Sequence, residues 1–423
     1  MRKIVLGMAG AVALGLCLAA RAQPGQGVPG ADVDALLSQA QSRNPDYAAL
    51  RHEAEAAEAR SLSAGALPDP RLRTEWRDIT RMGEQNATLA PSRVGSTRYL
   101  LMQDLPWFGK RDLKREVAEL EAAGAQGRAQ GIWAEIAGRI KTTFAQLYYV
   151  QRSERLNREL LDLMTRLEKI AQARYAGGLA AQQDVIRAQV EQTGLQNELI
   201  ALDMERHHLH TRMNALLSRP GGAPLATPER LRPLPAPARL DPAALADRVR
   251  ARNPQLFAEA SRVRMAEKSR DLAYKNRYPD FTVGVSPIQY GSAVKEWELM
   301  VELNIPLQQS SRRAQEREAE SLLSAAQARQ EAAANQALAE LSENLAGIEA
   351  ARRTESLLGG SLLPQAELTF QAALAGYETG KVDFATVLDA QRQIRQARQE
   401  RLKAQVEAQV RLAEIERLLG EDL

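Results

Sequence analysis

The sequence predicts a mainly α-helical, elongated protein that also carries four β-strands of membrane-spanning length. The composition supports this, because only 4% of the 423 residues are aromatic and 26% are charged, which is typical of long helices that pack through small side chains. An internal repeat supports it too: residues 175–189 (YAGGLAAQQDVIRAQ) match residues 377–391 (YETGKVDFATVLDAQ) without a gap, so one helical hairpin occurs twice. Finally, four segments alternate apolar and polar residues with the period of a strand.

The first 22 residues have the pattern of a secretory signal peptide. Two basic residues precede an apolar run over residues 4–20, and the small residues Ala20 and Ala22, on either side of Arg21, provide a cleavage site. The only cysteine, Cys17, lies in this segment; lipid attachment there is an alternative, although Leu16 is bulky for a lipidation motif. Cleavage after residue 22 leaves a mature chain without cysteine, and therefore without a disulfide or a thiolate metal site.

Residues 23–217 form the first of two predicted repeats. Prolines and glycines mark its boundaries, strict alternation marks its strands, and leucines spaced four and three apart between residues 156 and 167 mark a coiled-coil seam. In order, we expect a helix over 32–66 that breaks at Asn44-Pro45, strands over 71–77 and 97–105, a long helix over 110–174, a tip turn near 176–180 and a return helix to 217.

Residues 218–240 are a proline-rich linker, and residues 241–423 repeat the first half. Arg252-Asn253-Pro254 corresponds to Arg43-Asn44-Pro45, and Pro306 closes a strand as Pro106 does. We expect strands over 281–286 and 297–305, a long helix over 312–375 with a break near Gly359-Gly360 and Pro364, a tip turn near 378–381 and a final helix to 419.

The helix lengths predict a rod. At 1.5 Å per residue, the long helix of the first half spans roughly 100 Å, and two helices of about 35 residues span roughly 50 Å each. Two short helices laid end to end therefore match one long helix, with the linker where they meet.

The strands predict self-association. Strands of about 10 residues can cross a bilayer when tilted, with apolar residues toward lipid and polar residues toward water. Four strands cannot close a barrel, and open edges are not tolerated in hydrocarbon. If the strands lie in a membrane, the chain must therefore complete a barrel with copies of itself, and three copies supply twelve strands.

The strand-to-helix junctions 106–111 (PWFGKR) and 306–313, together with the two Tyr-x-x-Gly turns, resemble those of the TolC-type outer-membrane efflux factors. The resemblance covers essentially the whole mature chain. It implies a homotrimer with a 12-strand β-barrel in outer-membrane lipid on an α-helical barrel in the periplasm. It also implies two protein partners, a periplasmic adaptor (membrane fusion protein) and an inner-membrane pump.

The resemblance places functional residues at the tips. The tips of such hairpins contact the adaptor and form the gate; the alternative is that the glycines only turn the chain and the tyrosines only pack. The predicted adaptor contacts are Tyr175, Gly177, Gly178, Leu179, Tyr377, Gly380, Lys381 and Val382. The gate candidates are Asp383, Thr386 and Asp389; Thr386 stands where the family usually has an acid, and the alternative is that the two carboxylates are simply solvated.

Charged residues also mark the polar faces of the strands. Arg71, Arg73 and Arg77 in the first half and Glu298 and Glu302 in the second are predicted to face the lumen. A lumen of mixed charge would influence which solutes pass; the alternative is that polar residues merely face water.

No pattern of catalytic residues is present, and we expect no enzyme activity, no cofactor and no metal site. His207, His208 and His210 lie near Met204 and Met213, but no carboxylate or cysteine completes a metal-ligand set. The net charge of +3, without a basic stripe, gives no reason to expect a nucleic-acid partner.

We therefore predict the outer-membrane duct of a tripartite efflux or export system, a passive gated conduit for small molecules or metal ions. The alternative is a periplasmic coiled-coil adaptor or scaffold without a pore. The PWFGKR junction favours the metal-efflux branch, while the sequence leaves the exported substrate, whether a drug, a metal ion or another solute, open.

Overall fold

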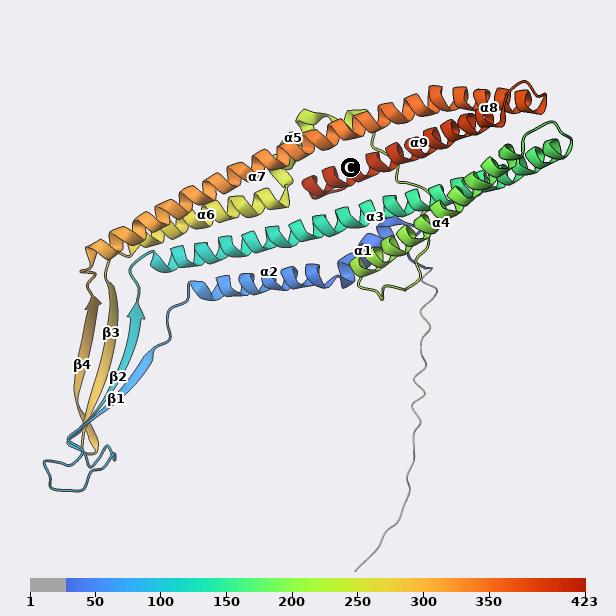
Figure 1. Ribbon diagram of the computed structural model, residues 1–423. Coiled ribbons are helices and arrows are strands. Elements are labelled where there is room, and N and C mark those ends of the chain that lie inside the picture. The colour runs from blue at the N-terminus through green and yellow to red at the C-terminus, as the bar shows by residue number, and fades with distance from the viewer. Residues whose placement is uncertain (1–27) are drawn as a thin grey trace, which may run out of the picture.

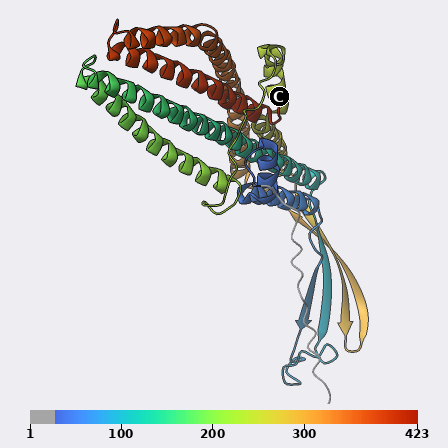
Figure 2. The same ribbon diagram turned by 90° about the vertical axis from the view of Figure 1, so that its right-hand side faces the viewer.

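The computed structural model describes residues 28–423, and the predicted signal peptide with Cys17 lies outside these residues. A bundle of long helices forms one elongated part, and a small sheet extends from one of its ends (Figure 1). The two hairpin turns lie at the other end of the helices, far from the sheet, in both views (Figures 1 and 2). None of the helices in residues 28–423 is long and apolar enough to cross a membrane.

The two halves have the same order of elements. The first half contains α1 (Val33–Arg43), α2 (Pro45–Ala64), β1 (Arg71–Arg77), β2 (Ser96–Leu105), α3 (Lys110–Ala176) and α4 (Gln182–Leu216). The second contains α5 (Pro242–Arg252), α6 (Pro254–Lys275), β3 (Asp280–Tyr290), β4 (Ala293–Asn304), α7 (Gln309–Leu357), the π-helical turn η2 (Leu358–Leu362), α8 (Leu363–Glu378) and α9 (Phe384–Leu419). The break expected near Gly359-Gly360 is thus a π turn within a continuous helix, and the linker contains only the short 3₁₀ helix η1 (Pro237–Leu240).

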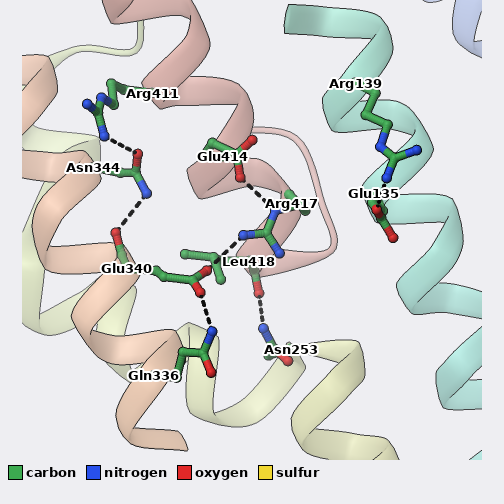
Figure 3. A network of polar contacts seen from close by, with 10 residues as sticks. All are labelled: Glu135, Arg139, Asn253, Gln336, Glu340, Asn344, Arg411, Glu414, Arg417 and Leu418. Atoms are coloured by element: carbon green, nitrogen blue, oxygen red, sulfur yellow. Dashed lines mark hydrogen bonds and ion pairs between the residues drawn. The ribbon is translucent and has the colours of Figure 1, made fainter. Parts of the chain in front are cut away.

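A repeated Asn-Pro pair joins the short helices end to end. Asn253 caps α6 by accepting a hydrogen bond from the Leu256 amide (2.9 Å), and its side-chain amide donates to the Leu418 carbonyl at the end of α9 (2.9 Å; Figure 3). Asn44 does the same in the first half, because it caps α2 and donates to the Leu216 carbonyl at the end of α4 (3.0 Å). The proline after each asparagine sits at the first helical position, where its missing N–H costs nothing.

Ion pairs connect the elements around the second joint. Arg417 of α9 binds Glu340 of α7 (2.8 Å) and Glu414 of its own helix (2.7 Å), as Figure 3 shows. Nearby, the buried Glu416 accepts from Lys141 of α3 and from Arg232 of the linker, both at 2.7 Å. Glu416 of α9 is therefore held by charge from two sides, by the linker and by the long helix α3.

The helices approach closely through small residues. Gly127 of α3 faces Ala258 of α6, and a Cβ at Gly127 would lie 3.1 Å from the Ala258 side chain and 3.0 Å from that of Phe257. Larger apolar side chains gather nearer the tips, where the expected leucine seam of α3 contributes to one core. That core contains Leu156, Leu160, Met164, Leu167, Leu195, Tyr377, Phe384 and Val387.

The four strands form one antiparallel sheet in the order β1-β2-β3-β4. The two central strands pair on both sides, whereas β1 and β4 each pair on one side only. One irregularity interrupts the register, between Ile288 and Gln289 near the β3–β4 turn. The sheet therefore has two open edges, one formed by β1 and the other by β4.

Candidate functional site: hairpin tips and strand faces

The first tip is a glycine-terminated helix end. After α3 ends at Ala176, Gly178 adopts a φ of +73°, and the Leu179 amide returns to the Arg174 carbonyl (2.8 Å). A positive φ strains any residue with a side chain, so glycine suits this position. Gly177 has a φ of −81° and does not share that requirement. Leu179 is 69% exposed at the apex.

The second tip repeats this geometry. Gly380 has a φ of +75°, and the Lys381 amide returns to the Gly376 carbonyl (2.8 Å). Lys381 and Val382 are exposed, so both apices present side chains to solvent. The predicted contact residues are therefore on the surface, except for one tyrosine.

The two repeated tyrosines differ. Tyr175 is half exposed, whereas Tyr377 is buried against Phe384, with ring centroids 5.3 Å apart. The Tyr377 hydroxyl donates to Asp184 of α4 (3.3 Å), and the Arg174 guanidinium lies over its ring. Burial, and secondly the negative charge of Asp184, raise the pKa of Tyr377 above its ordinary value of 10.0. Tyr377 therefore joins the second hairpin to the first, a role that the sequence pattern did not reveal.

Two of the gate candidates form a helix cap. Asp383 is the N-cap of α9, where one carboxylate oxygen accepts from the Thr386 amide (3.0 Å) and the Thr386 hydroxyl (2.6 Å). The Thr386 hydroxyl is the main reason that the pKa of Asp383 lies below its usual value. The corresponding position of the first tip, Ala181, offers no side-chain cap to α4.

Asp389 lies one turn further along α9 and is exposed, 3.4 Å from Arg392. Arg392 also binds Glu191 of α4, with 3.2 Å between its Nε and the carboxylate. Glu191 is largely buried, and the pair borders a groove between α4 and α9. Arg392 and Glu191 thus link the two hairpins close to the tips; both were missed in the sequence because they lie 201 positions apart.

The five predicted strand residues share one face of the sheet. Arg71 pairs with Met102, Met102 with Gly284 and Gly284 with Met300, and side chains directly opposite one another point to the same side. Alternation then places Arg73, Arg77, Glu298 and Glu302 on that side as well. Arg98, which the sequence did not single out, binds Glu298 (2.7 Å) at the centre of this face.

The other face of the sheet is apolar and exposed. Leu72, Trp297 and Leu299 are 68%, 71% and 76% exposed, whereas Ser286 and Ile288 on the charged face are buried. An exposed apolar face of this extent on a strand-only surface indicates contact with lipid or with another protein.

The histidines do not converge on a site. His207 and His208 are exposed, Met204 is 71% exposed, and Met213 is fully buried. His210 is partly buried, its Nε2 has no hydrogen-bond partner among the described residues, and burial lowers its pKa. Within residues 28–423, no group of three histidine, cysteine or acidic side chains is placed to hold a metal ion.

Comparison with known proteins agrees with this arrangement. Residues 245–421 match the family model "Outer membrane efflux protein". The cobalt-zinc-cadmium resistance protein CzcC of Cupriavidus metallidurans is 26% identical over 396 residues, covering 92% of this chain and 90% of CzcC.

Solved structures show the same fold over nearly the whole chain. The outer-membrane channel OprN superposes with a TM-score of 0.77 at 20% identity, covering 92% of this chain and 89% of OprN. The outer membrane protein VceC of Vibrio cholerae superposes with a TM-score of 0.78 at 17% identity, covering 92% of this chain and 96% of VceC.

These matches decide between the two predicted functions. The matched family consists of outer-membrane efflux channels, which are transporters and work with an adaptor and an inner-membrane pump, so a pore-less adaptor or scaffold is not the function. The chain is an outer-membrane efflux channel whose helices extend into the periplasm, and it is similar to the TolC-type proteins.

Proposed function

We propose that three copies of this chain form one gated export duct that carries divalent metal cations across the outer membrane. The observation that supports this most directly is the four-stranded sheet with two unpaired edges and an exposed apolar face. Backbone groups at an open edge cannot remain unpaired in hydrocarbon, and a barrel needs about eight strands or more. Three copies bring twelve strands, and the even number in each chain makes β4 of one copy antiparallel to β1 of the next.

The hairpin tips are the proposed surface for the adaptor. Both apices expose their residues on a backbone turned by a glycine of positive φ. These residues are small or apolar except for the basic Lys381, namely Gly177, Gly178 and Leu179 on the first and Gly380, Lys381 and Val382 on the second. Tyr175 extends this surface, whereas Tyr377 supports it from inside. A backbone hydrogen bond closes each turn, and a preformed turn suits recognition because less conformational entropy is lost on binding.

The contacts between the two hairpins are the proposed closed-state lock. Glu191–Arg392 and Asp184–Tyr377 join α4 to the second hairpin near the tips. If threefold symmetry gathers Asp389 around the axis, three carboxylates would attract cations to the constriction. Asp383 and Thr386 act on the gate through the α9 cap that they form.

The cargo is inferred from the relative. CzcC is named for resistance to cobalt, zinc and cadmium, and it matches this chain along nine-tenths of either length. Passive export of such cations requires charged and polar walls rather than a tight binding site. The charged strand face supplies such walls.

The experiment combines localisation with conductance. We expect the full chain to fractionate with the outer membrane, to run as a trimer by native mass spectrometry and to produce channels in planar bilayers. Deletion of its gene should lower the tolerance of cells to cobalt, zinc or cadmium, and re-expression should restore it. A monomer in the soluble periplasmic fraction would contradict the proposal, and a trimer without any effect on metal tolerance would contradict the cargo alone.

A further inference from the structure

We propose that the two open edges of the sheet recognise each other by charge, so that a basic edge of one copy binds an acidic edge of the next. The basic edge is Arg71, Arg73 and Arg77 of β1, and the acidic edge is Glu296, Glu298 and Glu302 of β4. The inference rests on the proposed function, since it presupposes that copies of the chain meet edge to edge. It assigns the specificity of that meeting to six side chains.

All six side chains lie on the same face. Glu75 is two residues from Arg73 and from Arg77 and so shares their face. It pairs with Arg98, Arg98 pairs with Ile288, and Ile288 pairs with Glu296. Because paired residues point to the same side, β1 and β4 carry their charges toward the interior of a closed barrel. Lys295 is the unpaired residue at the register irregularity near the turn at Gly291, and apart from it the opposite faces of these two strands carry no charge.

The charged residues of the two edges also occupy matching positions along their strands. Arg71 and Glu302 lie at the helix-proximal ends of their strands, whereas Arg77 and Glu296 lie toward the loops. Closing a barrel staggers neighbouring strands by a few residues. Such a stagger shifts which residues of the basic edge and the acidic edge meet, but it does not move any charge to the other face of the sheet.

The charges are incompletely paired within one chain. Three ion pairs form within the sheet. Arg98 in the middle of the sheet pairs with Glu298 (2.7 Å), Arg71 with Asp104 (2.7 Å) and Arg73 with Glu75 (2.8 Å). By contrast, Arg77 and Glu302 form no ion pair among residues 28–423, and both are exposed. Each edge therefore retains a net charge of its own sign.

The opposite charges of the two edges favour a closed ring of copies over a dimer. Pairing β1 with β1, or β4 with β4, would create a twofold dimer with arginine opposite arginine or glutamate opposite glutamate, and such a dimer leaves two open edges. Pairing β4 with β1 places opposite charges together and repeats until the ring closes. The arrangement thus favours the barrel and disfavours the dead-end dimer by the same six residues.

The test reverses the charges separately and together. One variant carries Arg71→Glu, Arg73→Glu and Arg77→Glu, a second carries Glu296→Arg, Glu298→Arg and Glu302→Arg, and a third carries all six changes. The measurement is the ratio of trimer to monomer in detergent extracts of the outer membrane, with circular dichroism of the helices as the folding check. Lys295→Glu, a charge reversal at the unpaired residue of β4 outside the set of six, is the matched control.

We expect each three-residue reversal to lower the ratio by roughly tenfold, because several like-charged cross-strand contacts replace opposite ones, and we expect the sixfold variant to recover it. The control should leave the ratio unchanged. A wild-type trimer that every reversal leaves intact, or a sixfold variant that does not recover, would overturn charge recognition while the trimeric channel stands. A wild-type chain that is monomeric in the membrane would overturn the proposed function itself.

Discussion

Asn44 and Asn253 carry out the same two tasks at equivalent joints. Each caps the start of one helix and donates to the last carbonyls of another, and both are buried. The sequence shows the repeated Arg-Asn-Pro, from which a helix break can be predicted. It does not show the carbonyl that each amide reaches, because Leu216 and Leu418 lie 172 and 165 positions away.

Replacing Asn253 should weaken the joint between α6 and α9. Asn253→Ala removes the cap and leaves the Leu418 carbonyl without its donor, so the free energy of unfolding should fall by about 1–3 kcal/mol. Asn335→Ala, at an exposed position within α7, should change it little. Denaturant melts in detergent, followed by circular dichroism, will compare the two; equal stabilities would show that the joint is held by packing alone.

His210 should make stability depend on pH. Burial lowers its pKa in the folded protein below the ordinary 6.5, so the unfolded chain binds a proton more readily. Stability should therefore be full above about pH 6.5 and should decline as the pH falls toward the lowered pKa. His210→Gln should flatten the melting temperature between pH 7.5 and pH 5, whereas His208→Gln, at an exposed position, should not; parallel curves would exclude this role.

At the scale of elements, the hydrophobic pattern and the positions of prolines and glycines predicted most of the observed helices and strands. Alternation located the four strands, and prolines and glycines located the breaks and turns, since these depend on neighbouring residues. Contacts between elements could not be predicted in the same way. The difference between Tyr175 and Tyr377 depends on Asp184, Arg174 and Phe384, which only the fold brings together.

The two tip turns allow a matched test of backbone strain. Gly178→Ala places a side chain at a φ of +73° and should lower stability by about 1 kcal/mol. Gly177→Ala is the control. Gly177 has a φ of −81°, so an alanine there should lower the stability much less. Melting temperatures of the purified channel in detergent measure both, and a larger loss for Gly177→Ala would refute the assignment of strain.

For the whole molecule, the state of the duct should depend on contacts between hairpins. Arg392→Ala removes the link from α9 to Glu191 of α4, and we expect the leak conductance in planar bilayers to rise several-fold. Arg398→Ala removes a comparable ion pair, with Glu367 at 2.9 Å, but within one hairpin, and should leave conductance unchanged. Exchanging the charges as Glu191→Arg with Arg392→Glu should close the channel again.

Asp389→Ala tests the constriction separately. If its carboxylate lies at the axis, removing it should raise the leak and reduce the preference for cations. Ion selectivity, measured as a reversal potential across a salt gradient, distinguishes this from a loosened tip. Unchanged conductance and selectivity would remove Asp389 from the gate.

The π-helical turn at Leu358–Leu362 affects which residues of the two halves are equivalent. The numbering difference between equivalent positions is 200 at Pro106 and Pro306, but 202 at Tyr175 and Tyr377. A π turn accommodates an extra residue inside a continuous helix, and the turn at Leu358–Leu362 lies between these two pairs of positions. Equivalent positions of the two halves are therefore not related by one constant difference in number, and a substitution should be transferred from one half to the other only after the local difference is known.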